Sequence, residues 1–208
     1  MIIGEYILTK KAANVYSTLG ASNHAAGDRA VLDFYETDPR AIEALIDNVK
    51  DIYHNVLEPA AGLGAIVEPL RKAGHKVYTT DIKQYPGYEL DKTINFYDLS
   101  REQIPFEHFD IVTNPPYCEA LKFLEHALNI LKEGERCYMF LRLQFLEGLE
   151  RGKFFKTNPP RFVYVFSRRV ACKKAGVQDK PSGAVAFAWF IFEKGYKGEP
   201  TIRWLLND

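Results

Sequence analysis

The segment LEPAAGLGAI, residues 57–66, joins an apolar run to an amphipathic one and decides how the chain is organised. The apolar run before it, residues 52–57, predicts a buried strand. The residues after it, 66–73, predict a helix that ends at Gly74. A strand, a glycine-containing turn and a helix in this order are typical of a parallel sheet.

The same alternation of strand and helix continues along the chain. The other predicted elements are helices over residues 37–49 and 119–131, and strands over 76–80, 109–113, 137–141, 162–166 and 184–192, with one more before Asp98. The strands over 162–166 and 184–192 have no helix between them, so we expect them to pair antiparallel at one edge. The pattern predicts a doubly wound, mainly parallel, Rossmann-like α/β sheet of about seven strands, with helices on both faces. We expect one domain over residues 31–208, preceded by a partly mobile segment over residues 1–30.

Composition narrows the class of protein further. The chain has 208 residues, 47% of them hydrophobic, with 27 basic and 27 acidic side chains. Its three cysteines, Cys118, Cys137 and Cys172, are odd in number and widely spaced, so we expect neither a disulfide framework nor a metal site. The start lacks a secretory leader, and the longest apolar run, residues 184–192, falls short of the ~20 residues that span a membrane. These features predict a soluble, cytoplasmic protein.

Positive charge gathers in one segment. Residues 151–180 contain nine Lys or Arg and one acid, Asp179. Such a segment is a candidate surface for a polyanion, although a solvated loop would have the same composition. The candidate phosphate contacts are Arg168, Arg169, Lys173 and Lys174.

The turn after the first strand is a candidate cofactor site, because ligands bind beyond the carboxyl ends of parallel strands. Gly62 and Gly64 let the backbone approach a ligand, and Ala60 keeps bulky side chains away. Glu58 ends the first strand, and Asp81 ends the second, 17 residues beyond Gly64. An acid at the second position can accept both hydroxyls of a ribose, although Asp81 could instead cap a turn.

The type of cofactor follows from these acids. NAD would favour a three-glycine loop, and Glu58 would lie unfavourably close to its phosphates. S-adenosylmethionine has a ribose, an adenine, an ammonium and a sulfonium but no phosphate, so it fits better. Asp98, beside Phe96 and Tyr97, could accept from the adenine amino group, or could simply begin a turn.

The sequence Asn-Pro-Pro-Tyr at residues 114–117 follows a predicted strand on the same rim. Pro115 and Pro116 cannot donate backbone hydrogen bonds, so we expect their carbonyls and the Asn114 side chain to accept from a planar amino group. Tyr117 supplies a stacking face. Acceptors on both amino hydrogens would direct the nitrogen lone pair at an electrophilic methyl group.

A second Asn-Pro-Pro occurs at residues 158–160, where Arg161 replaces the tyrosine. It precedes a predicted strand, where such a sequence is an ordinary turn. We therefore assign catalysis to the first copy and a structural role to Asn158.

Together these residues resemble class I S-adenosylmethionine-dependent methyltransferases with an Asn-Pro-Pro-Tyr motif, in particular phage-type DNA adenine-N6 methyltransferases. The resemblance covers roughly residues 34–206. It implies that Asp81 holds the ribose, that Asp98 holds the adenine amino group and that residues 114–117 hold the target base. It also places Phe34, Tyr35 and Thr37 beside the methionine part, although Asp38 interrupts the usual Thr-Pro pattern.

We therefore expect methyl transfer to N6 of adenine in DNA, with S-adenosylmethionine as the cofactor and no metal. The base would be flipped out of the helix and stacked on Tyr117. Similar motifs occur in RNA adenine or guanine methyltransferases and in protein glutamine methyltransferases, and a catalytically inactive nucleic-acid-binding subunit would keep the same fold. Because the chain is short for a target-recognition domain, a partner or a second copy could supply target recognition.

Overall fold

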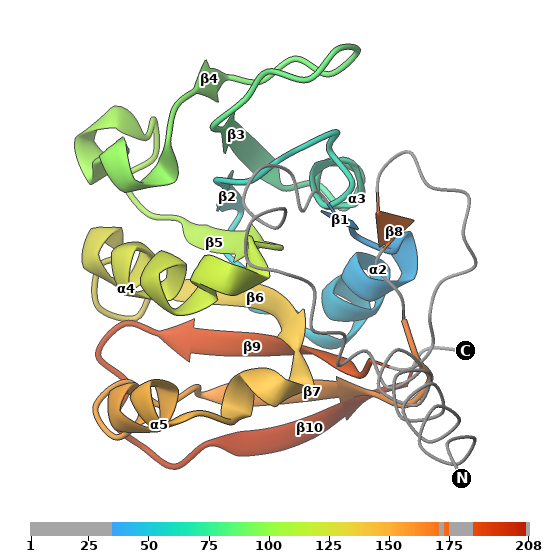
Figure 1. The fold of residues 1–208 in the computed structure, drawn as a ribbon. Helices are drawn as coiled ribbons and strands as arrows, with labels where there is room; N and C mark the ends of the chain where they lie inside the picture. The colour runs from blue at the N-terminus through green and yellow to red at the C-terminus, as the bar shows by residue number, and fades with distance from the viewer. Residues whose placement is uncertain (1–34, 171–172, 175–184, 207–208) are drawn as a thin grey trace, which may run out of the picture.

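The computed structural model describes residues 35–170, 173–174 and 185–206, and an eight-stranded sheet runs through its centre (Figure 1). The strand order is β10-β7-β9-β6-β5-β2-β3-β4. The strands are β2 (Asn55–Glu58), β3 (Lys76–Asp81), β4 (Lys92–Thr93), β5 (Asp110–Thr113), β6 (Arg136–Arg142), β7 (Phe162–Phe166), β9 (Phe187–Glu193) and β10 (Thr201–Leu205). Outside this sheet, β1 (Tyr35–Glu36) pairs antiparallel with β8 (Lys173–Lys174).

Strand direction places several strand ends on one edge of the sheet. Strands β4, β3, β2, β5 and β6 are parallel to one another, and β10 is parallel to β7. Strand β9 runs antiparallel to both β6 and β7. The carboxyl ends of β3, β2, β5, β6 and β7 therefore meet at one edge, together with the start of β9. The predicted doubly wound, mainly parallel sheet with an antiparallel part is confirmed, including the pairing of β7 with β9.

Helices cover both faces of the sheet (Figure 1). They are α2 (Pro39–Asn48), α3 (Val67–Lys72), α4 (Ala120–Ile130) and α5 (Leu149–Phe155). Strand β6 shows the two faces, because its side chains alternate between two apolar clusters. Tyr138 and Phe140 join the cluster that contains residues of α2 and α3, and Cys137 and Met139 join the cluster that contains residues of α4.

The start of α2 is fixed by local chemistry next to the sheet edge. The Asp38 carboxylate accepts from the Arg40 N–H (3.0 Å) as the helix N-cap, and Pro39 occupies the first turn. The Trp189 indole N–H of β9 donates to the Ala41 carbonyl (2.8 Å), which anchors the helix to the sheet. Asp38, the residue that interrupts the usual Thr-Pro pattern, is therefore a capping residue.

Several boundaries differ from the predictions for physical reasons. The third strand is only β4, because the Asn95 side chain accepts from the Tyr97 N–H (3.1 Å) and begins the 3-10 turn η1 (Phe96–Asp98). Neither α5, with Gly152 inside it, nor edge strand β10, with Arg203 inside it, was predicted. The other 3-10 turns are η2 (Arg101–Gln103), η3 (Tyr117–Glu119) and η4 (Leu143–Leu146). The predicted mobile segment, residues 1–30, lies outside the described residues.

Candidate active site

Polar and charged side chains follow the sheet edge in strand order. Glu58 and Asp81 end β2 and β3, and Asn114 directly follows β5. Arg142 ends β6. Because these strands are neighbours and parallel, the four residues lie on one edge, with the two acids at one side and the arginine at the other.

The glycine turn after β2 is tied to the end of β3. The Gly62 N–H donates to Asp81 Oδ2 (2.9 Å), and the Ala61 N–H donates to the Thr80 carbonyl (3.0 Å). Gly64 has a φ of 84°, and a Cβ built there would lie 2.3 Å from Cε2 of Tyr88. This position therefore requires glycine both for its backbone conformation and for space.

Glu58 is a buried acid with an unsatisfied oxygen. Its Oε1 accepts from the Ala60 N–H (2.9 Å), whereas Oε2 is buried and has no hydrogen-bond partner. Burial raises the pKa of Glu58 to about 8. The nearby Thr113 hydroxyl and the Ala60 N–H oppose that rise, although by geometry only the Ala60 N–H donates to the carboxylate. A ligand that brings a positive charge or an N–H donor would satisfy this oxygen.

Asp81 is nearly buried and is held by two backbone groups. Its oxygens accept from the N–H groups of Gly62 (2.9 Å) and Lys83 (3.1 Å), and burial raises its pKa. A carboxylate has about four acceptor sites, so each oxygen can still accept from a hydroxyl. Ile82, the next residue, is 68% exposed and offers an apolar surface beside the carboxylate. Ile82 was not among the site residues expected from the sequence, although it directly follows Asp81 in the chain.

Asn114 contacts the segment that precedes α2. Its Nδ2 donates to Oγ1 of Thr37 (3.0 Å), and Thr37 is only 3% exposed. The resemblance had placed Thr37 beside a cofactor, and the structure brings it to Asn114. Of the two residues grouped with Thr37, Phe34 lies outside the described residues and Tyr35 is described only as part of β1.

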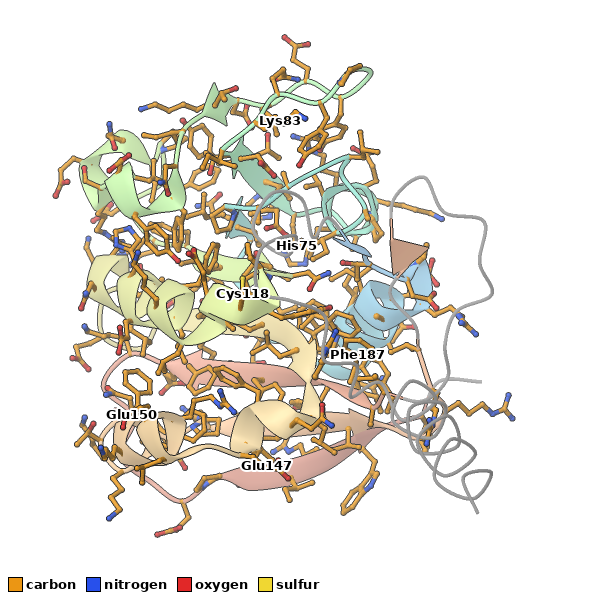
Figure 2. The ribbon with its side chains drawn as sticks, viewed as in Figure 1. His75, Lys83, Cys118, Glu147, Glu150 and Phe187 are labelled. Atoms are coloured by element: carbon orange, nitrogen blue, oxygen red, sulfur yellow. The ribbon has the colours of Figure 1, made fainter. Side chains whose placement is uncertain are left out.

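Tyr117 begins η3, after β5, and its ring contacts the start of β9 and the end of β6. Its ring centre is 6.0 Å from that of Phe187, and the Arg142 guanidinium carbon lies 5.1 Å from it. Figure 2 labels Phe187 and, next to Tyr117 in the chain, Cys118, which mark the two segments joined by this contact. Neither Phe187 nor Arg142 was among the site residues expected from the sequence.

The two prolines of the motif differ in their surroundings. Pro115 is buried and Pro116 is exposed. The Pro116 carbonyl accepts from the Glu119 N–H (3.0 Å), which closes the η3 turn. Of the two proline carbonyls expected to accept from an amino group, that of Pro116 therefore already accepts one backbone hydrogen bond and has one acceptor site left.

Asp98 is exposed in η1. The neighbouring Tyr97 hydroxyl donates to the Glu119 carboxylate (2.9 Å), which ties η1 to the turn after the motif. The structure thus places Asp98 in a turn connected to the candidate site and shows no contact between Asp98 and another described site residue.

The second Asn-Pro-Pro lies at the opposite edge of the sheet, before the amino end of β7. The Asn158 N–H donates to the Phe154 carbonyl (2.9 Å), and its Nδ2 donates to Thr157 Oγ1 (3.0 Å). This copy forms the turn between α5 and β7, at the sheet edge opposite the carboxyl ends of β2 and β5.

The described part of the basic segment, residues 151–170 and 173–174, divides between the two edges. At the far edge Lys153 pairs with Glu150 (2.8 Å) and Arg161 pairs with Glu193. Arg168 and Arg169 are exposed directly after the carboxyl end of β7, on the candidate-site edge. Lys173 and Lys174 form β8, which pairs with β1 just before Thr37. The four candidate phosphate contacts thus belong to the part of the segment that returns to the site.

Within the described ranges, no group of three or more His, Cys, Asp or Glu side chains is arranged to hold a metal ion. None of the helices in those ranges is long and apolar enough to cross a membrane.

Comparison with known proteins supports the fold. No protein-family model and no curated protein matches the sequence. A modification subunit attributed to a type I restriction enzyme from Vibrio vulnificus YJ016 has a TM-score of 0.52 and 14% identity over 97% of this chain, which spans 52% of that subunit. The 23S rRNA methyltransferase ErmE has a TM-score of 0.54 and 17% identity, covering 80% of this chain and 72% of its own. A predicted O-methyltransferase from Agrobacterium tumefaciens has a TM-score of 0.54 and 17% identity, covering 81% of this chain and 86% of its own.

At these identities the likeness shows the fold alone. The chain has the Rossmann-like fold that these methyltransferases share, with a candidate site at the carboxyl edge of its sheet. It spans about half the length of the Vibrio subunit.

Proposed function

We propose that this protein transfers a methyl group from S-adenosylmethionine to N6 of adenine in DNA. The observation that carries the proposal is the alignment of Glu58, Asp81 and Asn114 along one sheet edge. The fold supports it, since two of the compared structures are described as methyltransferases and one as a modification subunit.

The acidic side of the edge would hold the cofactor. The unsatisfied Oε2 of Glu58 fits its ammonium group, and Asp81 fits the two ribose hydroxyls. The exposed face of Ile82 suits an adenine ring, with Asp98 accepting from the adenine amino group. When bound, S-adenosylmethionine supplies an electrophilic methyl group on a sulfonium.

Asn114 would hold the amine that receives the methyl group. Its Nδ2 donates to Thr37, so its amide oxygen is the atom that can accept from an amine. The Pro115 carbonyl is the second acceptor in this proposal, and the ring of Tyr117 stacks on the base. Two acceptors on the amino hydrogens favour a pyramidal nitrogen whose lone pair points at the methyl group. The nitrogen loses a proton after methylation.

DNA is the proposed substrate because basic residues reach the same edge. Arg168 and Arg169 follow β7 there, and β8 brings Lys173 and Lys174 to β1. A partner or a second copy would supply target recognition, as the Vibrio protein of similar fold is a subunit.

Incubation with tritiated S-adenosylmethionine and separate DNA, RNA and protein pools tests the proposal. Label in DNA supports the proposal. Label confined to RNA adenine or guanine would instead indicate an RNA methyltransferase, and label confined to protein glutamine would indicate a protein methyltransferase. Cofactor binding without label in any pool would indicate an inactive nucleic-acid-binding subunit.

Replacing Asp81 with alanine should weaken S-adenosylmethionine binding, because the ribose hydroxyls would lose a buried acceptor. The expected loss is about 1–3 kcal/mol, measured by calorimetry. Asp47→Ala, an exposed acid on α2, is the matched control and should leave affinity unchanged. Binding of NAD without binding of S-adenosylmethionine would refute the cofactor assignment.

Replacing Lys173 and Lys174 with alanine should reduce the salt dependence of DNA binding. Each phosphate contact contributes a log-log slope of about −0.9 on duplex and about −0.7 on single strands. The double variant should reduce the magnitude of the slope by the equivalent of about one to two phosphate contacts. Its affinity should fall equally for all DNA sequences, because phosphates carry no base identity. Salt titrations on one labelled oligonucleotide measure this, and an unchanged slope would mean that these two lysines are solvated and contact no phosphate.

A further inference from the structure

Arg142 differs in charge from Glu58 and Asp81, the acids at the same sheet edge. It is half-buried at the end of β6, opposite Phe187 of β9, and its Nε is buried without a hydrogen-bond partner. Among the described residues it forms no ion pair, whereas Arg101 pairs with Glu135 and Arg136 pairs with Glu193. A partly buried guanidinium without an anion is costly, unless a ligand supplies one.

The guanidinium is also fixed in place beside the proposed base-stacking residue. Its central carbon lies 5.1 Å from the ring centre of Tyr117, a distance at which a cation is attracted to an aromatic face. An arginine held in this way keeps N–H donors at its edge, which suit two oxygens of one phosphate.

We propose that Arg142 binds a phosphate of the nucleotide whose base stacks on Tyr117. This rests on the proposed function and deepens it, because it makes the substrate a nucleotide rather than an amide side chain. The sheet edge is then divided by charge, with Glu58 and Asp81 for the cationic cofactor and Arg142 for the anionic substrate. A glutamine side chain carries no anionic group that would neutralise the charge of Arg142.

Binding of two small probes that differ by one phosphate tests this inference. We would titrate the protein, saturated with S-adenosylhomocysteine, with 2′-deoxyadenosine and with 2′-deoxyadenosine 5′-monophosphate, and follow binding by NMR. The wild type should prefer the monophosphate about tenfold or more, and Arg142→Gln should bind both equally. Arg142→Lys should keep part of the preference, because it retains the charge and loses the planar fork.

A matched control separates phosphate binding from packing. Arg203, on β10, also stacks on an aromatic ring, since its guanidinium carbon lies 4.3 Å from the ring centre of Phe162 on β7. Arg203→Gln should leave the preference intact. Equal binding of both probes by the wild type, or a preference that survives undiminished in Arg142→Gln, would overturn the inference. Methyl transfer to the DNA, RNA and protein pools is measured separately. A preference lost in Arg142→Gln alongside a failure to label nucleic acid would therefore refute the proposed function and leave the phosphate site standing.

Discussion

Replacing Asn114 with alanine should lower the rate of methyl transfer by about 10²–10³-fold while leaving affinity for S-adenosylmethionine almost unchanged. The amide oxygen would act on the amine as it becomes pyramidal, so its loss removes an interaction made mainly in the transition state. Thr37 fixes the amide by accepting from Nδ2, which keeps the oxygen oriented before substrate arrives. Single-turnover rates with tritiated cofactor, together with calorimetric affinities, measure the two effects separately.

The chain contains its own control for this experiment. Asn158 has the same two prolines after it but lies at the opposite edge of the sheet, where its amide donates to Thr157. Asn158→Ala should keep the rate within a few-fold and lower stability at most modestly. Equal losses of rate in the two variants would contradict the assignment of catalysis to Asn114.

The central sheet was predictable because its strands are buried on both faces. Such strands appear in the sequence as short continuous apolar runs, and β5 and β6 were located within one or two residues. Edge strand β10 has an exposed arginine at its centre, and α5 contains a glycine, so neither has the pattern of a buried element. Their positions depend on tertiary contacts that periodicity does not record.

The candidate site was predictable where it depends on strand ends and not where it depends on contacts across the fold. Glu58, Asp81 and Asn114 each follow an apolar run, which places them on one edge of any parallel sheet. The hydrogen bond between Asn114 and Thr37 joins residues 77 positions apart in the sequence. The contact of Arg142 with Tyr117 joins the end of β6 to η3. In the basic segment, a count of charges likewise could not show which residues form ion pairs. It did not distinguish Arg161, which pairs with Glu193, from the arginines after β7.

Binding of S-adenosylmethionine should become stronger as pH rises toward 8, because the cofactor needs Glu58 in its ionised form. Burial raises the pKa of Glu58 to about 8, so the side chain is protonated at neutral pH in the free protein. An ammonium group beside Oε2 favours the carboxylate, and binding would therefore release a proton. Affinity should fall about tenfold for each pH unit below 8, down to the pKa of Glu58 in the complex.

The folding stability of the free protein should change with pH in the opposite direction to cofactor affinity. An acid whose pKa is raised on folding holds a proton that the unfolded chain has lost, so folding stability decreases as pH rises from the unfolded pKa to about 8. Glu58→Gln lacks this titration. Its thermal stability should therefore decline less than that of the wild type over the same range.

The same variant isolates the effect on binding. Between about pH 5.5 and 7.5 the α-amino group of the ligand stays mostly protonated, since such groups titrate at about 7.7–8.0. Over this window wild-type affinity should rise by up to about 100-fold, and that of Glu58→Gln should change much less. Calorimetry in two buffers of different ionisation enthalpy counts the proton released, which should approach one for the wild type and zero for the variant. Equal pH profiles for the two proteins would show that the cofactor does not bind against Glu58, and the buried oxygen would then need another ligand.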